Sequence, residues 1–204
     1  MYAAAMADSA NGVFLIGDNC NGNLADYDTL AAVVKKHEAL TSYMVVGNHD
    51  LFFKGWQYFY KYFGSSIYYL TVSTPAADDI FIVLDTGGGT LGELQLQWFK
   101  DLLSSQRQNF RNCIVLTHNN ILLSRHTIST LPMPEEVQVL LELFLKYNVN
   151  DCIAGHDHRY DKFVFGNTHY FVTDALLDGH KNASYLKLKV KDGTISVSRH
   201  PVSE

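Results

Sequence analysis

The sequence predicts an α/β fold that continues into a β-rich tail. Short apolar runs, several of them closed by glycine, alternate with longer segments of helical spacing as far as Gly155. After that point, strand-like runs follow one another without a helical segment between them. The chain has 204 residues, 47% of them hydrophobic, which is enough to bury one large core. We therefore expect a single domain over residues 1–204.

Short, continuous apolar runs predict the strands of the α/β part. In chain order the runs are Val13–Ile16, Tyr43–Val46, Ile67–Val72, Ile80–Leu84, Cys113–Leu116 and Cys152–Ala154. Val13–Ile16, Tyr43–Val46, Cys113–Leu116 and Cys152–Ala154 are of the buried type, without the alternation of a half-exposed strand. Glycine follows the first, second and last run, which allows a sharp turn of the backbone where the strand ends.

Apolar residues spaced three or four apart predict the helices between these strands. The segments are Tyr2–Ala10, Tyr27–Leu40, Phe52–Phe63, Leu91–Leu103 and Pro134–Tyr147. Proline suits the first turn of a helix because its missing N–H needs no partner there, so Pro134 marks a helix start. Phe52–Phe63 is rich in aromatic residues, which are expected to pack in the core or, alternatively, to form a wall for an apolar or aromatic substrate.

The tail is predicted to be made of strands. Its apolar runs are Phe163–Phe165, Tyr170–Val172, Tyr185–Val190 and Thr194–Val197. Asp192-Gly193 separates the last two, and this dipeptide favours a tight hairpin turn. An antiparallel pair is therefore expected at the end of the chain.

Composition excludes several classes of function. A net charge of −5 excludes a generally basic surface for nucleic acid. No apolar run reaches the length of a transmembrane helix, and the N-terminus lacks the basic start and long apolar segment of a signal peptide, so no membrane partner is expected and the cytoplasm is the default location. The cysteines Cys20, Cys113 and Cys152 form no CxxC pair and are interpreted as buried free thiols.

Polar clusters follow four of the predicted strands. They are Gly17-Asp18-Asn19, Gly47-Asn48-His49-Asp50, Thr117-His118-Asn119-Asn120 and Gly155-His156-Asp157-His158. Ligand sites of open α/β sheets form beyond the carboxyl ends of the strands, so these clusters are expected to converge. Carboxylate, amide oxygen and imidazole are the ligands of catalytic Mn, Fe or Zn sites. On an extended segment His156 and His158 would share a face and could serve two adjacent cations.

In this order, Gly17-Asp18-Asn19-Cys20-Asn21 and the other three clusters resemble the calcineurin-like metallophosphoesterase family. Ile80–Asp85 and Leu91–Trp98 resemble its middle strand and helix. The resemblance implies a four-layer α/β/β/α sandwich with two divalent cations, in which a metal-activated hydroxide hydrolyses phosphate mono- or diesters.

The same resemblance implies a role for each site residue. Asp18 would bridge two cations; Asn48, His118 and His156 would complete the ligands of one cation, and His158 would bind the other. His49 would be the catalytic acid beside the leaving group. Asn21 and Asp50 are expected to orient side chains or contact the substrate; many relatives carry aspartate at the position of Asn21.

One motif of the family is not found. The family begins with a strand that ends in Asp-x-His, and no such motif precedes Val13. The N-terminal strand is therefore expected to be missing, through trimming, a start at an internal methionine or natural truncation. We expect one strongly bound cation, impaired activity, and an exposed sheet edge that could form a homodimer. The alternative is a degenerate interaction module without catalysis, as in a retromer subunit that resembles the family.

Overall fold

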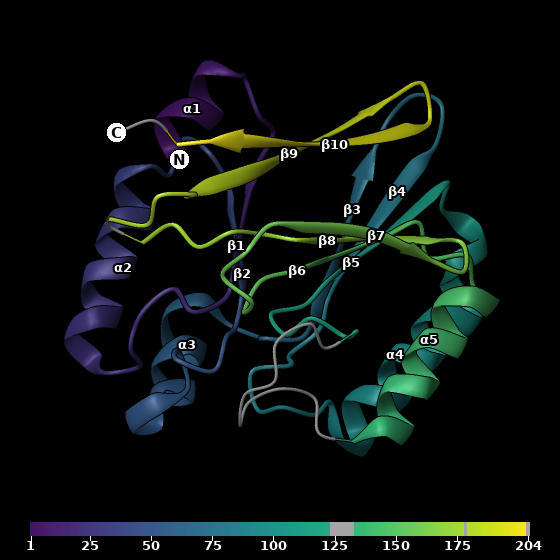
Figure 1. Ribbon diagram of the computed structural model, residues 1–204, viewed down its shortest axis with the longest axis horizontal. Coiled ribbons are helices and arrows are strands. Elements are labelled where there is room, and N and C mark those ends of the chain that lie inside the picture. The colour runs from purple at the N-terminus through teal and green to yellow at the C-terminus, as the bar shows by residue number, and fades with distance from the viewer. Residues whose placement is uncertain (123–132, 178, 203–204) are drawn as a thin grey trace.

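The structure is a computed structural model that describes residues 1–122, 133–177 and 179–202 (Figure 1). Its helices are α1 (Tyr2–Ala7), α2 (Leu24–Lys36), α3 (Gly55–Phe63), α4 (Gly92–Gln106) and α5 (Pro134–Lys146), with short 3₁₀ turns at Phe52–Lys54 and Arg107–Asn109. Its strands are β1 (Val13–Ile16), β2 (Ser42–Val45), β3 (Tyr68–Ser73), β4 (Asp78–Val83), β5 (Asn112–Leu116), β6 (Asp151–Ala154), β7 (Asp161–Phe165), β8 (Thr168–Val172), β9 (Ser184–Lys191) and β10 (Thr194–Pro201).

The largest sheet has six strands in the order β3-β4-β5-β6-β8-β7. Its four central strands run parallel, and the two outer strands are antiparallel to their neighbours. β1 and β2 form a separate parallel pair, and β9 and β10 an antiparallel hairpin. Because parallel strands all end at one edge, the loops after β4, β5 and β6 emerge together, as do those after β1 and β2.

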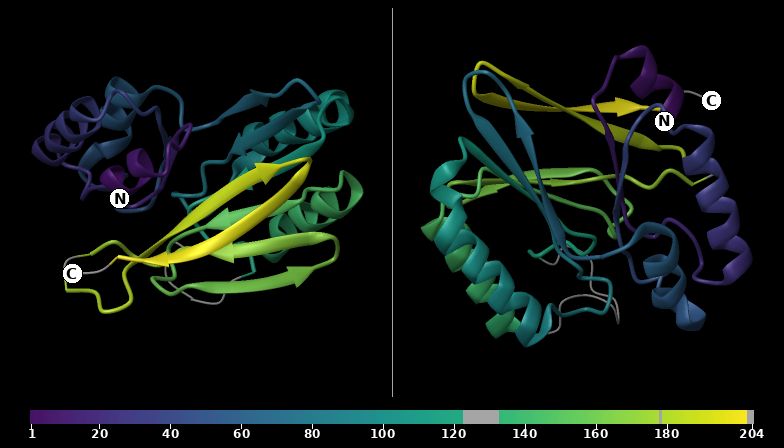
Figure 2. Two further views of the ribbon diagram at one scale, coloured as in Figure 1. Left: turned by 90° about the horizontal axis from the view of Figure 1, so that it is seen from above. Right: turned by 180° about the vertical axis from the view of Figure 1, so that it is seen from behind.

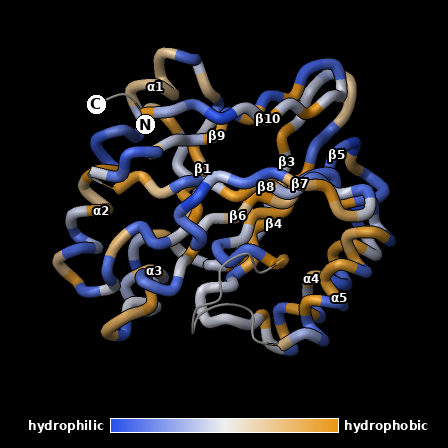
Figure 3. Tube along the Cα trace, in the orientation of Figure 1, coloured by the Kyte–Doolittle hydropathy of each residue, from blue (hydrophilic) through white to orange (hydrophobic). Residues whose placement is uncertain are grey.

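Helices α4 and α5 cover one face of the six-stranded sheet (Figures 1 and 2). Ile80, Ile82 and Cys113 on the sheet pack against Phe99 of α4 and Phe144 of α5, and the two phenylalanine rings meet edge to face with 6.1 Å between their centroids. Each of these side chains is almost fully buried, which makes this the main hydrophobic core. Figure 3 shows the hydrophobic residues concentrated along these central strands.

The other face of the sheet is covered by strands. Phe81, Val83 and Ile114 alternate with the residues of the first core and pack against Phe14 of β1 and Leu186 of β9. The pair β1–β2 and the hairpin β9–β10 therefore pack on the same face of the six-stranded sheet.

Helices α2 and α3 cover the outer side of β1–β2. Met44 and Val46 pack there against Tyr27 of α2 and Phe59 of α3, all of them buried. The Tyr27 hydroxyl also donates a hydrogen bond of 2.8 Å to the backbone oxygen of Asp50, which links α2 to the loop after β2.

The predicted elements are present, with changes at their ends. The helix expected at Tyr27–Leu40 is α2, which begins at Leu24 because Asn23 caps it by accepting a 3.1 Å hydrogen bond from the Asp26 N–H. The turn at Asp192-Gly193 has the positive φ values, 50° and 83°, of the expected hairpin. Cys113 and Cys152 are buried free thiols as expected, whereas Cys20 is only half-buried. Among the described residues no helix is long and apolar enough to span a membrane.

Candidate functional site

Four loops meet where β1–β2 faces the six-stranded sheet, and three glycines show how closely they approach. A Cβ on Gly17 would lie 2.3 Å from Nδ1 of His118, and a Cβ on Gly47 would lie 2.4 Å from Oδ1 of Asp18. A Cβ on Gly155 would lie 2.9 Å from the backbone oxygen of Ile16. Any larger residue would push these loops apart, so the glycines that follow the strands allow the loops to touch.

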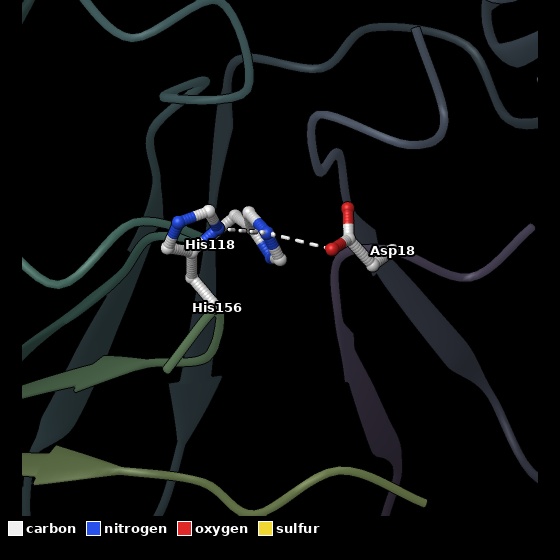
Figure 4. A group of neighbouring side chains, drawn as sticks. All are labelled: Asp18, His118 and His156. Carbon is white, nitrogen blue, oxygen red and sulfur yellow. Dashed lines mark hydrogen bonds and ion pairs between the residues drawn. The ribbon is translucent and has the colours of Figure 1, made fainter. Parts of the chain in front are cut away.

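The loops bring four ligand atoms together, and Figure 4 shows three of the residues that contribute them, Asp18, His118 and His156. Nε2 of His118 lies 3.3 Å from Oδ2 of Asp18 and 3.2 Å from Oδ1 of Asn48. Nδ1 of His156 lies 3.1 Å from the same Asn48 oxygen and 3.3 Å from Nε2 of His118. Asp18, His118 and His156 each offer one atom within 4.8 Å of the others.

This donor set fits a divalent cation. A cation with bonds of about 2.1 Å separates neighbouring ligand atoms by about 3.0–3.4 Å. The four contacts given above, at 3.1–3.3 Å, have this spacing, and Asp18 and His156 offer atoms within 4.8 Å of each other. Two of the atoms are imidazole nitrogens that face each other, an arrangement that becomes favourable when both lone pairs point at one positive ion. One carboxylate, one amide oxygen and two imidazoles suit Mn, Fe or Zn.

The backbone of β1 orients the His118 ring. Nδ1 of His118 lies 2.8 Å from the backbone oxygen of Ile16, and a carbonyl oxygen can only accept, so this nitrogen carries the proton. Nε2 is thereby directed at Asp18 and Asn48 as a ligand atom. The ring is 1% exposed, which keeps it in this orientation.

Asp18 and His118 shift each other's titration. Burial raises the pKa of Asp18, but the hydrogen bond and positive charge of His118 outweigh it and hold that pKa below its ordinary value. Burial lowers the pKa of His118, but the hydrogen bond and charge of Asp18 outweigh this and raise it. The pair thus favours a positive charge between its members, which either a proton or a cation can supply.

Thr86, which sequence reasoning missed, holds the loop of His118. Its hydroxyl oxygen accepts hydrogen bonds from the N–H groups of His118, at 3.1 Å, and Asn119, at 2.9 Å. Its backbone oxygen accepts from the Asn119 side-chain amide at 2.7 Å. The available signal was its place just after the strand Ile80–Leu84, at the same edge as the other clusters.

Asp50 is fully buried beneath the loops, where its carboxylate accepts three hydrogen bonds. Its Oδ2 accepts from the Gly47 N–H at 2.8 Å and from Asn19 Nδ2 at 3.2 Å, and its Oδ1 accepts from the Cys20 N–H at 3.0 Å. Burial raises the pKa of Asp50 to about 6, against the opposing effect of these donors. Asp50 therefore ties the loop after β1 to the loop after β2.

His49 lies beside the ligand group with its ring half-buried. Its backbone N–H donates a 2.8 Å hydrogen bond to Oδ1 of Asp18, so the other carboxylate oxygen remains the one that faces His118. Asn21 places its Oδ1 3.4 Å from Nδ1 of His49, the contact expected of an orienting residue. The Phe52 ring packs against the same imidazole, with 4.8 Å between centroids.

His158 is not part of the group formed by Asp18, His118 and His156. The expectation that His156 and His158 share a face of an extended segment is wrong, because both have left-handed backbones with φ of 65° and 54°. The loop turns sharply after Gly155, and this turn brings Nδ1 of His156 onto Asn48. Within the described ranges, the structure therefore assembles one compact group of His and Asp ligands.

Comparison with known proteins agrees with the fold described above. A family model described as calcineurin-like phosphoesterase matches residues 3–160. A dimetal phosphatase from Danio rerio superposes with a TM-score of 0.75 at 12% identity, over 98% of this chain and 84% of that one. No curated protein sequence gives a significant match.

Two further solved structures have the same fold. A purple acid phosphatase from yellow lupin seeds gives a TM-score of 0.74 at 16% identity, over 98% of this chain but only 46% of that one. GAP50, the anchor in the inner membrane complex of Plasmodium, gives 0.66 at 13% identity, over 100% of this chain and 82% of that one. At these identities the likeness establishes the α/β fold.

Proposed function

The chain belongs to the calcineurin-like phosphoesterase family, whose members are metal-dependent phosphoesterases, and from this premise we propose that it hydrolyses phosphate mono- or diesters. The observation that carries the proposal is the set of four ligand atoms, contributed by Asp18, Asn48, His118 and His156, at the spacing that a divalent cation requires. We take the packing of helices on two layers of strands as the α/β/β/α sandwich of the family, formed by one domain.

Each residue has a proposed task. Asp18, Asn48, His118 and His156 hold one cation, and His158 belongs to the second cation that relatives bind. A bound divalent cation supplies positive charge that draws in the phosphate and makes a nearby water more acidic. Asp50 and Thr86 hold the loops at the distances that the ligands need, so little reorganisation is required when a substrate binds.

His49 is the proposed acid. Its backbone is fixed on Asp18, and its ring is half-buried at the edge of the ligand group, within reach of a phosphate held there. A protonated imidazole placed there can donate a proton to the leaving oxygen of the ester. Asn21 orients the ring through its side-chain oxygen.

We expect one tightly bound Mn²⁺ per chain, because the described residues form one compact ligand group. The measurement is isothermal titration with Mn²⁺ at pH 7.5, checked by metal analysis after gel filtration. Tight filling of two equivalent sites would contradict this expectation. With one cation in place, turnover is expected to be slow compared with two-cation phosphatases.

Replacing His49, the proposed acid, should affect the rate of hydrolysis but not the affinity for the metal. His49→Gln should lower kcat for p-nitrophenyl phosphate or bis-p-nitrophenyl phosphate by about 100-fold or more, because the leaving oxygen loses its proton donor. Mn²⁺ affinity should stay within about 3-fold of wild type, since His49 contributes only its backbone to the ligand group. A wild-type chain that hydrolyses neither ester with Mn²⁺ would refute the phosphoesterase proposal.

The second candidate is an interaction module without catalysis. It is favoured by the likeness to the structure described as an anchor, and by β1, which pairs with β2 alone in the part of the chain described here. The free edge of β1 offers unpaired backbone groups to a partner strand or to a second copy. The same ester assay separates the two candidates, because an interaction module would bind Mn²⁺ weakly and turn over neither substrate.

A further inference from the structure

Two exposed phenylalanines, Phe52 and Phe53, stand next to the proposed acid. Their exposed fractions are 44% and 75%. The core packing expected for the aromatic residues of this segment holds for some of them: Phe59 is 1% exposed, and Tyr62 and Phe63 pack with it, whereas Trp56 and Tyr60 are exposed. We call Phe52 and Phe53 the aromatic ledge.

The ledge begins one ring away from the imidazole of His49. The Phe52 and His49 rings have centroids 4.8 Å apart at 47° between planes. The Phe53 ring lies 6.4 Å beyond the Phe52 ring, edge to face at 79°. Since His49 is linked through its N–H to Asp18, the two rings lie next to the proposed acid and close to the ligand group.

The backbone is strained in a way that keeps the ledge exposed. Phe53 and Lys54 are consecutive left-handed residues, with φ of 52° and 68°, a conformation that L residues avoid. Two glycines lie very close to neighbouring backbone in this segment. A Cβ on Gly22 would lie 2.4 Å from the backbone oxygen of Phe52, and a Cβ on Gly55 would lie 1.8 Å from the backbone oxygen of Asp50. The strained backbone exposes the large apolar ring of Phe53 to solvent, so its cost is not offset by burial of that ring within the chain. This combination indicates that the ring binds a ligand.

We propose that the aromatic ledge binds an aromatic leaving group of the substrate, an aryl ring or a nucleobase. This rests on the proposed function, because the phosphate must sit on the ligand group for the ring to reach the ledge. A flat ring stacks on Phe53 or packs beside Phe52 without needing specific hydrogen bonds, so the ledge selects aromatic over aliphatic esters.

Binding of matched ligand pairs to the Mn²⁺-loaded chain tests this without turnover. Phenylphosphonate is compared with methylphosphonate, and AMP with ribose 5-phosphate, by titration calorimetry. In wild type the aromatic member of at least one pair should bind about 10-fold tighter, and the pair that shows the preference distinguishes an aryl ring from a nucleobase. Phe53→Leu, which keeps an apolar residue in the same backbone conformation, should reduce the ratio at least about 3-fold.

Tyr60→Leu is the matched control, because Tyr60 is a similarly exposed aromatic residue of α3, at 59%, whose ring pairs with Trp56 instead of His49. It should leave the ratio unchanged. Equal binding within both pairs in wild type, or a ratio unaffected by Phe53→Leu, would overturn the proposal that the aromatic ledge binds the leaving group. The phosphoesterase proposal would stand, and a protein partner would then be the better occupant of the ledge. If none of the four ligands binds, the proposed function fails and the ledge proposal fails with it.

Discussion

Asp18→Asn is expected to raise the Kd for Mn²⁺ by about 100-fold or more, which corresponds to about 2.7 kcal/mol of binding free energy. The substitution replaces Oδ2, the oxygen 3.3 Å from Nε2 of His118, with an amide nitrogen that has no lone pair for a cation. It also removes the only negative charge of the four-ligand group. Titration calorimetry with Mn²⁺ measures the change directly.

The fold should tolerate Asp18→Asn. Asp18 has a left-handed backbone, with φ of 53°, and asparagine adopts this conformation readily. The remaining Oδ1 can still accept from the His49 N–H, and the new amide can donate to His118. The pKa of His118 should fall, because burial is then no longer outweighed by the carboxylate, and NMR titration of the imidazole would detect this.

Asp101→Asn is the matched control for charge, since Asp101 lies on the exposed side of α4. It should change neither Mn²⁺ affinity nor the pKa of His118. Retention of wild-type Mn²⁺ affinity in Asp18→Asn would exclude Asp18 as a ligand and would remove the main support for the proposed metal site.

Asp50→Ala should lower the free energy of unfolding by about 3 kcal/mol, because three donors beneath the site lose their acceptor. For a chain of this size the melting temperature should fall by about 6–12 °C. The loops after β1 and β2 would no longer be tied together, so Mn²⁺ affinity should also fall, by about 10-fold or more. Urea unfolding of the metal-free protein measures the stability change.

The Asp50 effect should depend on pH with a defined sign. Burial raises the pKa of Asp50 from its ordinary value of 3.8 to about 6, so the folded protein retains a proton that the unfolded chain releases between these values. The contribution of Asp50 to stability is fully present below that range and declines as the pH rises through about 6. The difference between wild type and Asp50→Ala should therefore be larger at pH 5 than at pH 7.

Asp101→Ala serves as the control for this series and should stay within about 0.5 kcal/mol of wild type, as expected for an exposed side chain. If Asp50→Ala were as stable as wild type, the carboxylate would not be the connection between the two loops that its hydrogen bonds indicate.

The order and type of the elements could be predicted because they depend on local patterns. Val13–Ile16 and Cys113–Leu116 are apolar without alternation, which is characteristic of strands buried on both faces, and both are strands. Cys113–Leu116 is buried throughout, whereas in Val13–Ile16 only Val13 is buried and the other three residues are half-buried. The boundaries of the helices were predicted less accurately. Helix α2 begins three residues before the predicted Tyr27, because its first residue is set by the cap that Asn23 provides.

The site could be predicted only in part. Asp18, Asn48, His118 and His156 each follow a strand, so their meeting at the strand ends was foreseeable from the rule for parallel sheets. The sharp turn at His156 and His158 was not, because it depends on left-handed backbone conformations that non-glycine residues seldom adopt. The role of Thr86 in holding the His118 loop could not be predicted either, since a threonine after a strand has many ordinary roles.

By itself, the amino-acid sequence determined which residues follow which strands, and hence which ligand and acid side chains are available at the strand ends. This is because hydrophobic periodicity and the glycines that end strands act over a few neighbouring residues. Only the tertiary structure decided that Nε2 of His118 faces Asp18 and Asn48 while Phe53 faces solvent. Those outcomes depend on how β1–β2 packs on the six-stranded sheet and on contacts such as His118 to Ile16, which join residues far apart in the chain.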